Sequence, residues 1–528
     1  MKVIQDTAIQ LTLPQEVANK VLTHIHKSEK VADHGDRKEV AIYWGHDEVK
    51  TLMVYLDALW MDSTTSQIPS PMARDYKWPG IFTPFAHQKD TAAFLSIRPR
   101  AFCFNEAGTG KTSAVVWAAD YLMTLGVVKR VLVICPLSIM WSAWQADIFK
   151  TAMHRSVAVA YGDASKRKKI INSDYEFVII NFDGVNIVKD EIEKGGFDLI
   201  VVDEANAYKT ATTKRWKTLA KLIKPNTWLW MMTGTPASQS PVDAFGLARL
   251  VAPTRVPKFV TAWRDKVMTQ VTRFKWVPRP TAQSHIHFAL QPAIRFTKSE
   301  CLDLPDVTYQ TREIPITPQV AKYYKALKTQ LLVEAAGENI SAVNAAAAMS
   351  KLLQISGGAV YSDKRDVVQF DVGPRLKALQ EVVEETLEKV VVFVPFLHTI
   401  DIVTEFLRGD GYTVEVIKGD VTARQRAEII NRFQTQSDPK ILVVQPQSAS
   451  HGVTLTLANT VVFWSPVMSV ETYLQCIARI DRVGQKNRMT VVHLQSTDAE
   501  RKVYAMLQGK VDNHLKLVDL YKQELETV

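Results

Sequence analysis

The segment from Ala101 to Thr112 constrains what this chain can fold into more than any other. An apolar run leads directly into Gly-Thr-Gly-Lys-Thr, and a helical pattern follows from Ser113 to Leu122. A strand that turns through glycines into a helix lets backbone N–H groups face an anion, and the helix N-terminus adds the positive end of its dipole. The segment therefore predicts a nucleotide phosphate site. Its candidate residues are Gly108, Thr109, Gly110, Lys111 for the β- and γ-phosphates of ATP, and Thr112 for Mg²⁺.

A pair of acids ends the apolar run that starts at Leu199. In parallel α/β sheets, ligands bind at the carboxyl ends of the strands, so Asp203 and Glu204 are expected beside the phosphate site. Asp203 is predicted to hold Mg²⁺, and Glu204 is predicted to orient or deprotonate the attacking water.

Apolar runs alternate with helical patterns in both halves of the chain, which predicts an α/β fold with two parallel sheets, each covered on both faces. We expect an accessory N-terminal domain at 1–80, a first lobe at 81–254, an inserted mainly helical region at 255–373 and a second lobe at 374–528, with the nucleotide between the lobes. The accessory domain is predicted to hold a strand at 40–44 and a helix at 49–60. The strands predicted for the two lobes are 101–104, 131–135, 177–181, 199–203, 228–233, 390–394, 413–417, 441–444, 460–464 and 490–494.

Polar side chains outside these segments complete the predicted site. Gln88 precedes the phosphate loop, and its amide offers a donor and an acceptor that suit the Hoogsteen edge of adenine. On one continuous helix, Gln475, Arg479 and Arg482 would share a face, since their spacing is i, i+4 and i+7. Two guanidiniums aimed together suit the charge that develops on a triphosphate, and an arginine finger is typically worth about 10³–10⁵ in rate.

The ordered set of motifs resembles that of the Swi/Snf-type DNA translocases of helicase superfamily two. The similarity runs from about Phe82 to Leu494, and Asn105 fits this family's form of the phosphate loop, which lacks the first glycine of the general pattern. The segments that carry the similarity are Asn105–Thr112, Cys135–Ser138 with Trp141 and Trp144, Thr233–Pro236, Ile294–Pro305, Leu352–Ile355, His451–Thr456 and Gln475–Gln485.

The resemblance implies two RecA-like lobes that close on Mg-ATP and move along duplex or branched DNA, mostly through backbone contacts. It assigns Gly452 to the nucleotide site, Lys111 and Glu204 to hydrolysis, and Gln475 with the two arginines to sensing in the second lobe. The chain departs from the family at Asn206, where a His is usual, and at Phe296, where a second Arg is usual. No histone-reading segment is recognisable, so we do not expect nucleosome remodelling.

The N-terminal stretch around Val40–Trp60 resembles the small HARP module of annealing helicases, and compact phage helicases also act on branched DNA. This resemblance implies fork reversal, branch migration or strand annealing, in DNA repair, replication or recombination. The excess of 64 Lys and Arg over 55 Asp and Glu favours a polyanionic partner. No protein partner is indicated.

No run reaches the ~18 apolar residues that a membrane helix needs, and no signal-peptide core opens the chain. We therefore expect a soluble intracellular protein, in the cytoplasm of a bacterium or of an infected cell, or in a nucleus. The four cysteines lie far apart with no C-x-x-C pair, which predicts reduced thiols and suggests no zinc site.

Two alternatives remain open at this point. An RNA-dependent helicase would use the same ATPase core, although the inserted region and the Arg-x-x-Arg-x-Gly-Gln ending argue against it. An ATP-gated DNA-binding scaffold would bind the nucleotide without turnover, although Lys111, Asp203, Glu204 and Arg482 are all intact.

Overall fold

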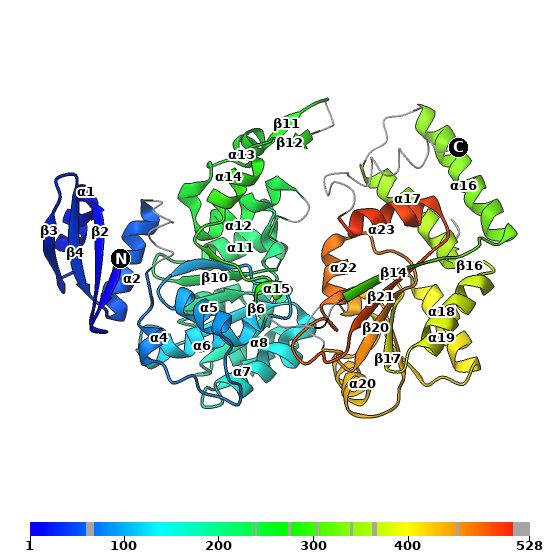
Figure 1. The fold of residues 1–528 in the computed structure, drawn as a ribbon, viewed down its shortest axis with the longest axis horizontal. Helices are drawn as coiled ribbons and strands as arrows, with labels where there is room; N and C mark the ends of the chain where they lie inside the picture. Colours follow the sequence, from blue (N-terminus) through cyan, green and yellow to red (C-terminus); the bar gives the residue numbers. More distant parts are fainter. Residues whose placement is uncertain are drawn as a thin grey trace. The chain divides into compact units, whose positions relative to one another are not determined.

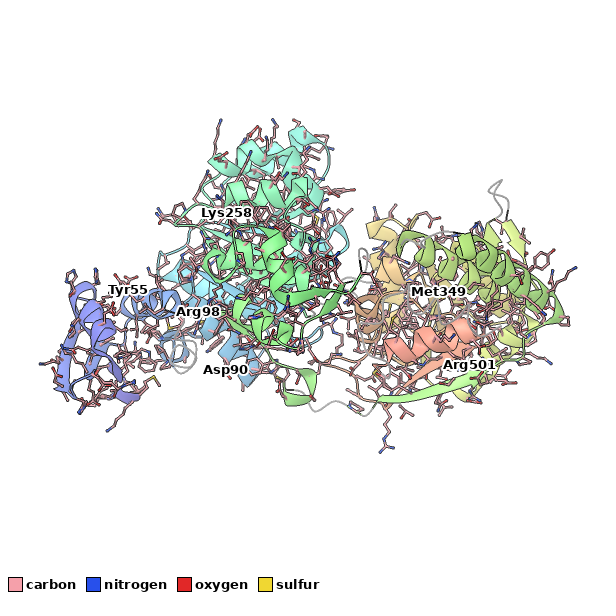
Figure 2. All side chains as sticks on the ribbon, turned by 90° about the horizontal axis from the view of Figure 1, so that it is seen from above. Tyr55, Asp90, Arg98, Lys258, Met349 and Arg501 are labelled. Atoms are coloured by element: carbon pink, nitrogen blue, oxygen red, sulfur yellow. The ribbon has the colours of Figure 1, made fainter. Side chains whose placement is uncertain are left out.

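The computed structural model divides the chain into two compact units, Met1–Cys301 and Leu302–Val528 (Figure 1). Figure 2 shows their side chains and labels Asp90 in the first unit and Arg501 in the second. The structure describes residues 1–59, 68–234, 236–237, 240–272, 276–301, 305, 307–337, 342–361, 367–449 and 454–509.

The first unit begins with an antiparallel sheet of four strands in the order β1-β2-β4-β3. The strands are β1 (Lys2–Ile4), β2 (Ala8–Pro14), β3 (Ser28–Asp33) and β4 (Arg37–Tyr43), with the helices α1 (Gln15–His24) and α2 (His46–Ala58). Alternate residues of β2, such as Ile9 and Leu11, are buried, and they pack in one cluster with Val21 and Leu52 from the helices. The strand predicted at 40–44 and the helix predicted at 49–60 are confirmed over the described residues, with shifted ends.

The rest of the first unit surrounds a parallel sheet of seven strands in the order β13-β5-β10-β9-β6-β8-β7. Neighbouring residues of one strand, such as Leu132 and Val133, belong to different buried clusters, so helices cover both faces of the sheet. The strands are β5 (Arg100–Cys103), β6 (Val131–Cys135), β7 (Val157–Val159), β8 (Phe177–Asn181), β9 (Leu199–Val202), β10 (Trp228–Met232) and β13 (Ala293–Ile294).

Helices connect the strands of this lobe along the chain, as the alternating pattern predicts, and two further helices precede β5. They are α4 (Met72–Asp75), α5 (Ala86–Ser96), α6 (Lys111–Thr124), α7 (Ala146–Thr151), α8 (Ala164–Ile171), α9 (Phe182–Ile187), α10 (Lys189–Lys194), α11 (Lys214–Leu222), α12 (Ala244–Val251), α13 (Val260–Val267), α14 (Ala282–Ala289) and α15 (Lys298–Cys301), with a small hairpin of β11 (Met268–Gln270) and β12 (Trp276–Pro278).

The second unit repeats this architecture with a parallel sheet of six strands in the order β14-β21-β20-β17-β19-β18. Val391 and Val392 of the central strand again belong to clusters on opposite faces. The strands are β14 (Val307–Glu313), β17 (Lys389–Phe393), β18 (Val414–Ile417), β19 (Ile441–Val444), β20 (Ala458–Phe463) and β21 (Met489–Gln495). The helices are α16 (Pro318–Gly337), α17 (Ala342–Gly357), α18 (Gly373–Glu385), α19 (Leu397–Gly409), α20 (Ala423–Thr435), α21 (Pro446–Ala449), α22 (Val470–Ile477) and α23 (Asp498–Leu507), with a hairpin of β15 (Ala359–Tyr361) and β16 (Val367–Gln369).

The prediction of an α/β fold with two parallel sheets is confirmed. The region at 255–373 supplies the helices α13, α14, α15, α16 and α17, and it also supplies an edge strand to each sheet: β13 pairs with β5, and β14 pairs with β21. The division between the compact units falls inside this region, after Cys301. The finer boundaries of the four predicted parts stay a prediction.

Two further expectations concern helices and cysteines. No helix among the described ranges is long and apolar enough to cross a membrane. All four cysteines are free thiols, as predicted.

Candidate active site

The phosphate loop leaves β5 after Cys103 and enters α6 at Lys111, two residues before the predicted start of the helix. Gly108 and Gly110 have φ angles of 93° and 73°, in the left-handed region where a side chain would be strained. The first backbone N–H groups of α6 therefore open onto a loop of small residues. A helix terminus of this kind is suited to bind an anion.

Two side chains at the start of α5 form hydrogen bonds with the backbone of this loop. The ring Nε2 of His87 hydrogen-bonds the carbonyl of Thr109 at 2.8 Å, and the amide Nε2 of Gln88 donates to the carbonyl of Gly110 at 3.1 Å. The amide oxygen of Gln88 accepts a hydrogen bond from the backbone N–H of Phe85 at 2.9 Å. In this structure Gln88 holds the phosphate loop, and its contact with adenine stays a prediction.

Asn105 and Glu106 attach the loop to the segment that ends the first unit. Asn105 is 1% exposed; its Nδ2 donates to the Thr91 hydroxyl at 2.8 Å, and its Oδ1 accepts from the backbone N–H of Phe296 at 3.1 Å. The Glu106 carboxylate accepts from the N–H of Lys298 at 3.0 Å. Sequence reasoning treated Asn105 only as a missing glycine, because its partners are far away in the chain.

The acidic pair lies where the sheet order predicts it. Asp203 directly follows β9 and is 5% exposed, and Glu204 has left-handed backbone angles of φ 51° and ψ 54°. The Glu204 N–H donates to Asp203 Oδ1, and the indole N–H of Trp144 donates to Asp203 Oδ2, both at 2.9 Å. Sequence reasoning gave Trp144 no role in this site.

Lys111 and Asp203 both lie close enough to the buried Cys103 for their charges to affect the pKa of its thiol. Burial raises the pKa of Cys103 to about 11; the Lys111 charge opposes this shift and the Asp203 charge adds to it. The Lys111 ammonium also donates to the carbonyl of Asn105 at 3.3 Å. Since β5 and β9 flank β10 in parallel, the structure brings the predicted lysine and acids together at the carboxyl edge of one sheet.

The segment after β10 closes this edge. Thr233 is fully buried, and its N–H donates to the carbonyl of Cys103 at 3.1 Å. A side chain at Gly234 would lie 3.4 Å from the backbone nitrogen of Ala107, so the segment packs directly on the phosphate loop. Thr235 of the same motif lies outside the described residues.

The donor set fits Mg²⁺. The Asp203 carboxylate and the Thr112 hydroxyl are hard oxygen ligands, the kind that Mg²⁺ binds together with substrate phosphates. Each oxygen of Asp203 accepts one N–H in the structure and keeps a second lone-pair position for a metal ion or its water.

The second unit corrects one prediction. Gln475, Arg479 and Arg482 do not share the face of one helix, because α22 ends at Ile477. The carbonyl of Arg479 accepts from Leu455 N–H at 2.8 Å, and tight turns follow, including Gln485 N–H to the Arg482 carbonyl at 3.0 Å.

The two arginines of this segment differ in how far they are buried. Arg479 is 7% exposed and its Nε donates to the Gln475 carbonyl at 3.1 Å, whereas Arg482 is half-buried in the turn. Gly452 lies outside the described residues.

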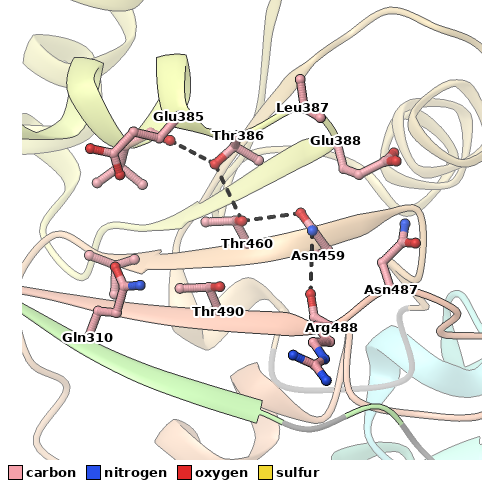
Figure 3. A pocket seen from close by; sticks show the side chains of 12 residues that line it. Gln310, Glu385, Thr386, Leu387, Glu388, Asn459, Thr460, Asn487, Arg488 and Thr490 are labelled. Atoms are coloured by element: carbon pink, nitrogen blue, oxygen red, sulfur yellow. Dashed lines mark hydrogen bonds between the residues drawn. The ribbon is translucent and has the colours of Figure 1, made fainter.

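Two hollows accompany these elements, each within its own unit. The first, of about 490 Å³, lies beside the phosphate loop and is lined by Phe85, Ala86, His87, Asp90, Arg295, Phe296, Glu300 and Cys301. The second, of about 410 Å³, lies in the second unit (Figure 3). Thr460 and Thr490 in its wall lie near the first residues of β20 and β21, so it opens at the amino edge of that sheet.

Comparison with known proteins gives matches over most of the chain. The family model described as SNF2-related domain matches residues 87–358, more than half of the chain, and the model described as helicase conserved C-terminal domain matches residues 374–484.

The matched relatives include phage and animal proteins. The chain is 26% identical over 438 residues to putative protein p41 of Acyrthosiphon pisum secondary endosymbiont phage 1, covering 78% of this chain and 92% of that protein. It is 24% identical over 443 residues to chromodomain-helicase-DNA-binding protein 1-like of Danio rerio, covering 80% of this chain and 42% of that protein. The chain spans less than half the length of several curated relatives. The Sulfolobus solfataricus SWI2/SNF2 ATPase core in complex with dsDNA aligns with a TM-score of 0.41 and 21% identity, covering 85% of this chain and 96% of that chain.

Proposed function

The chain belongs to the SNF2-related family of helicase-type ATP hydrolases, and we propose that it is a DNA-dependent ATPase that moves along duplex or branched DNA and remodels it. The observation that carries this proposal is the meeting of the phosphate loop with Asp203 and Glu204 at the carboxyl edge of one buried sheet. This arrangement supports the proposal, because a glycine-containing loop, a lysine and two acids lie on the same side of the sheet.

The residues of the first unit divide the work of hydrolysis. The backbone of Gly108–Gly110 and the N-terminus of α6 bind the phosphates, and Lys111 balances the charge of the β- and γ-phosphates. Asp203 and Thr112 would hold Mg²⁺, which supplies positive charge to the phosphate oxygens when it is bound. Glu204 orients the attacking water and takes its proton.

Glu204→Gln tests this assignment, because it removes the base and keeps the size of the side chain. ATP binding is expected to persist while turnover is abolished, as measured by nucleotide titration and by phosphate release. Glu300→Gln is the matched control, since Glu300 lies at the same edge region on α15. Unchanged turnover in Glu204→Gln would contradict the assignment of the base.

For the second unit, we assign Gln475, Arg479 and Arg482 to sensing the triphosphate. A guanidinium suits an arginine finger because it carries a permanent positive charge that can stabilise the charge developing on the phosphoryl group, and hydrogen bonds to the carbonyls of Arg479 and Arg482 hold the backbone of this turn. Arg482→Ala should lower the DNA-stimulated rate far more than ATP affinity, and Arg488→Ala, in the same loop region, should change neither. Equal losses of rate and affinity in Arg482→Ala would count against the finger role.

DNA is the partner that the composition and the relatives favour. The net charge of +9 suits a polyanion, and the Danio rerio relative is named as a DNA-binding protein. Movement along DNA of any sequence requires contacts with the phosphate backbone, so binding should weaken steeply with salt. Stimulation mainly by RNA would favour an RNA-dependent helicase instead, and nucleotide binding without turnover would favour a scaffold.

A further inference from the structure

Trp144 is held at the acidic pair by a geometry that core packing alone does not require. It is fully buried, and its indole N–H donates to Asp203 Oδ2 at 2.9 Å, across a sequence separation of 59 residues. Indole offers a single polar atom, which can only donate. In this site the indole N–H donates its hydrogen bond to the carboxylate that is predicted to hold the metal ion.

The backbone aims this indole toward Asp203. After β6, a short 3₁₀ turn η1 (Leu137–Ile139) leads into a π-helical turn η2 (Met140–Gln145), which carries Trp144. A π turn contains one more residue than an α turn, and such turns are frequent at functional sites. Strands β6 and β9 are parallel neighbours, so the residues that follow them meet at the carboxyl edge.

The main chain reinforces the same contact. The N–H of Asp203 donates to the carbonyl of Ile134 at 2.9 Å, which continues the ladder between β6 and β9 by one step. The backbone of Asp203 is therefore fixed by β6, and its side chain by the turn that follows β6. Its two oxygens accept from two different directions, from Trp144 and from Glu204 N–H. Two donors at fixed positions define the plane of the carboxylate.

We propose that Trp144 is a positioning residue for the metal-holding Asp203, and that its indole N–H sets how tightly the site takes Mg²⁺ with the nucleotide. The inference rests on the proposed function, because it takes Asp203 as the metal ligand. Partners that orient a ligating carboxylate typically change metal affinity by about 10- to 100-fold when they are removed. The nucleotide itself, which contacts the loop and α6, should bind without metal as before.

The test compares two tryptophan-to-phenylalanine variants. Trp144→Phe deletes the N–H and keeps an aromatic ring. Trp230→Phe is the matched control: Trp230 is also fully buried in the same cluster, and its N–H donates at 2.9 Å to the carbonyl of Arg98, labelled in Figure 2, before the first residue of β5. Both variants lose one buried indole hydrogen bond, but only one loses it at Asp203.

The measurement is binding of a fluorescent, non-hydrolysable ATP analogue, first in EDTA and then across a titration of Mg²⁺, below the melting temperature of each variant. We expect all three proteins to bind equally in EDTA. Trp144→Phe should need about 10- to 100-fold more Mg²⁺ to reach the tighter, metal-dependent affinity, whereas Trp230→Phe should follow the wild type.

A double-mutant cycle separates positioning from packing. In an Asp203→Asn background, Trp144→Phe should cause no additional change in the Mg²⁺ requirement, because its effect passes through the carboxylate. The proposal is overturned if Trp144→Phe and Trp230→Phe have the same Mg²⁺ requirement, or if the Trp144→Phe effect persists in full with Asp203→Asn. A wild type that binds no nucleotide, or binds it with no dependence on Mg²⁺, would instead overturn the proposed function together with this inference.

Discussion

Gly110→Ala is the substitution whose consequences the structure specifies most closely. Gly110 has a φ of +73°, and an alanine in the left-handed region costs about 1–2 kcal/mol. The added Cβ would also lie 2.2 Å from the Gln88 amide nitrogen, so this amide must move. Moving it breaks two hydrogen bonds, to the Gly110 carbonyl and from Phe85 N–H, at about 0.5–1.5 kcal/mol each. We expect a loss of about 2–5 kcal/mol in the free energy of unfolding of the first unit.

A cycle with Gln88→Ala tests the reasoning behind this number. Gln88→Ala alone should cost about 1–3 kcal/mol, the value of its two hydrogen bonds. Because Gly110→Ala already displaces the amide, the double variant should cost about 1–3 kcal/mol less than the sum of the single variants. Urea unfolding followed by tryptophan fluorescence is a suitable assay, since eleven of the twelve tryptophans belong to the first unit. Additive costs would refute the contact between Gln88 and the loop.

Three other predictions concern titration, thiol reactivity and a buried ion pair. Burial lowers the pKa of His46 below its ordinary 6.5, so on acidification the imidazole is protonated in the unfolded chain before it is protonated in the folded protein. Thermal stability should therefore fall as the pH drops below about 6.5. In melting curves, His46→Gln should weaken this dependence of the melting temperature on pH, and an unchanged dependence would contradict the expectation. Burial raises the pKa of Cys103 to about 11 and of Cys476 to about 12, and it also raises those of Cys135 and Cys301, but only Cys301 among the four is partly exposed. Iodoacetamide at neutral pH should therefore modify Cys301 first, as mass spectrometry would show, and early labelling of the other three would contradict this expectation. Arg375→Met should cost about 3–5 kcal/mol, because the buried Glu500 carboxylate keeps donors such as Ser496 N–H but loses the positive partner that it contacts at 2.8 Å. Arg424→Met, at an exposed pair, should cost less than about 1 kcal/mol, and equal effects of the two variants on hydrogen exchange in α18 would contradict this expectation.

The strands of the two lobes were predictable because the sequence records their burial directly. β6 and β19 are short, unbroken apolar runs, β8 is apolar up to its last residue, Asn181, and the predicted ends of all three agree with the structure. β14 escaped prediction for the opposite reason: most of its residues are exposed, so a polar edge strand that pairs with β21 resembles a linker. The order of strands within each sheet depends on pairing between distant segments, which no local pattern records.

The candidate site shows the same division between local and distant causes. The phosphate loop and the acid pair were predictable, because spacing alone places glycines, a lysine and carboxylates at strand ends. The end of α22 was not predictable, because the i, i+4, i+7 spacing of Gln475, Arg479 and Arg482 continues beyond the helix. There the Arg479 carbonyl accepts a hydrogen bond from Leu455 N–H. The contact of Trp144 with Asp203 was equally hidden, because the π turn that aims the indole leaves no periodic signature.

The ATPase rate in five conditions tests the central claim most directly: no nucleic acid, single-stranded DNA, plain duplex, forked duplex and RNA, each at two salt concentrations. If the protein is a DNA translocase, duplex or forked DNA should strongly stimulate the ATPase rate and RNA should stimulate it little. The stimulation by DNA should fall steeply at the higher salt concentration. A preference for forks would support remodelling of branched DNA. Hydrolysis that RNA stimulates more than DNA, or no hydrolysis in any condition, would contradict the account.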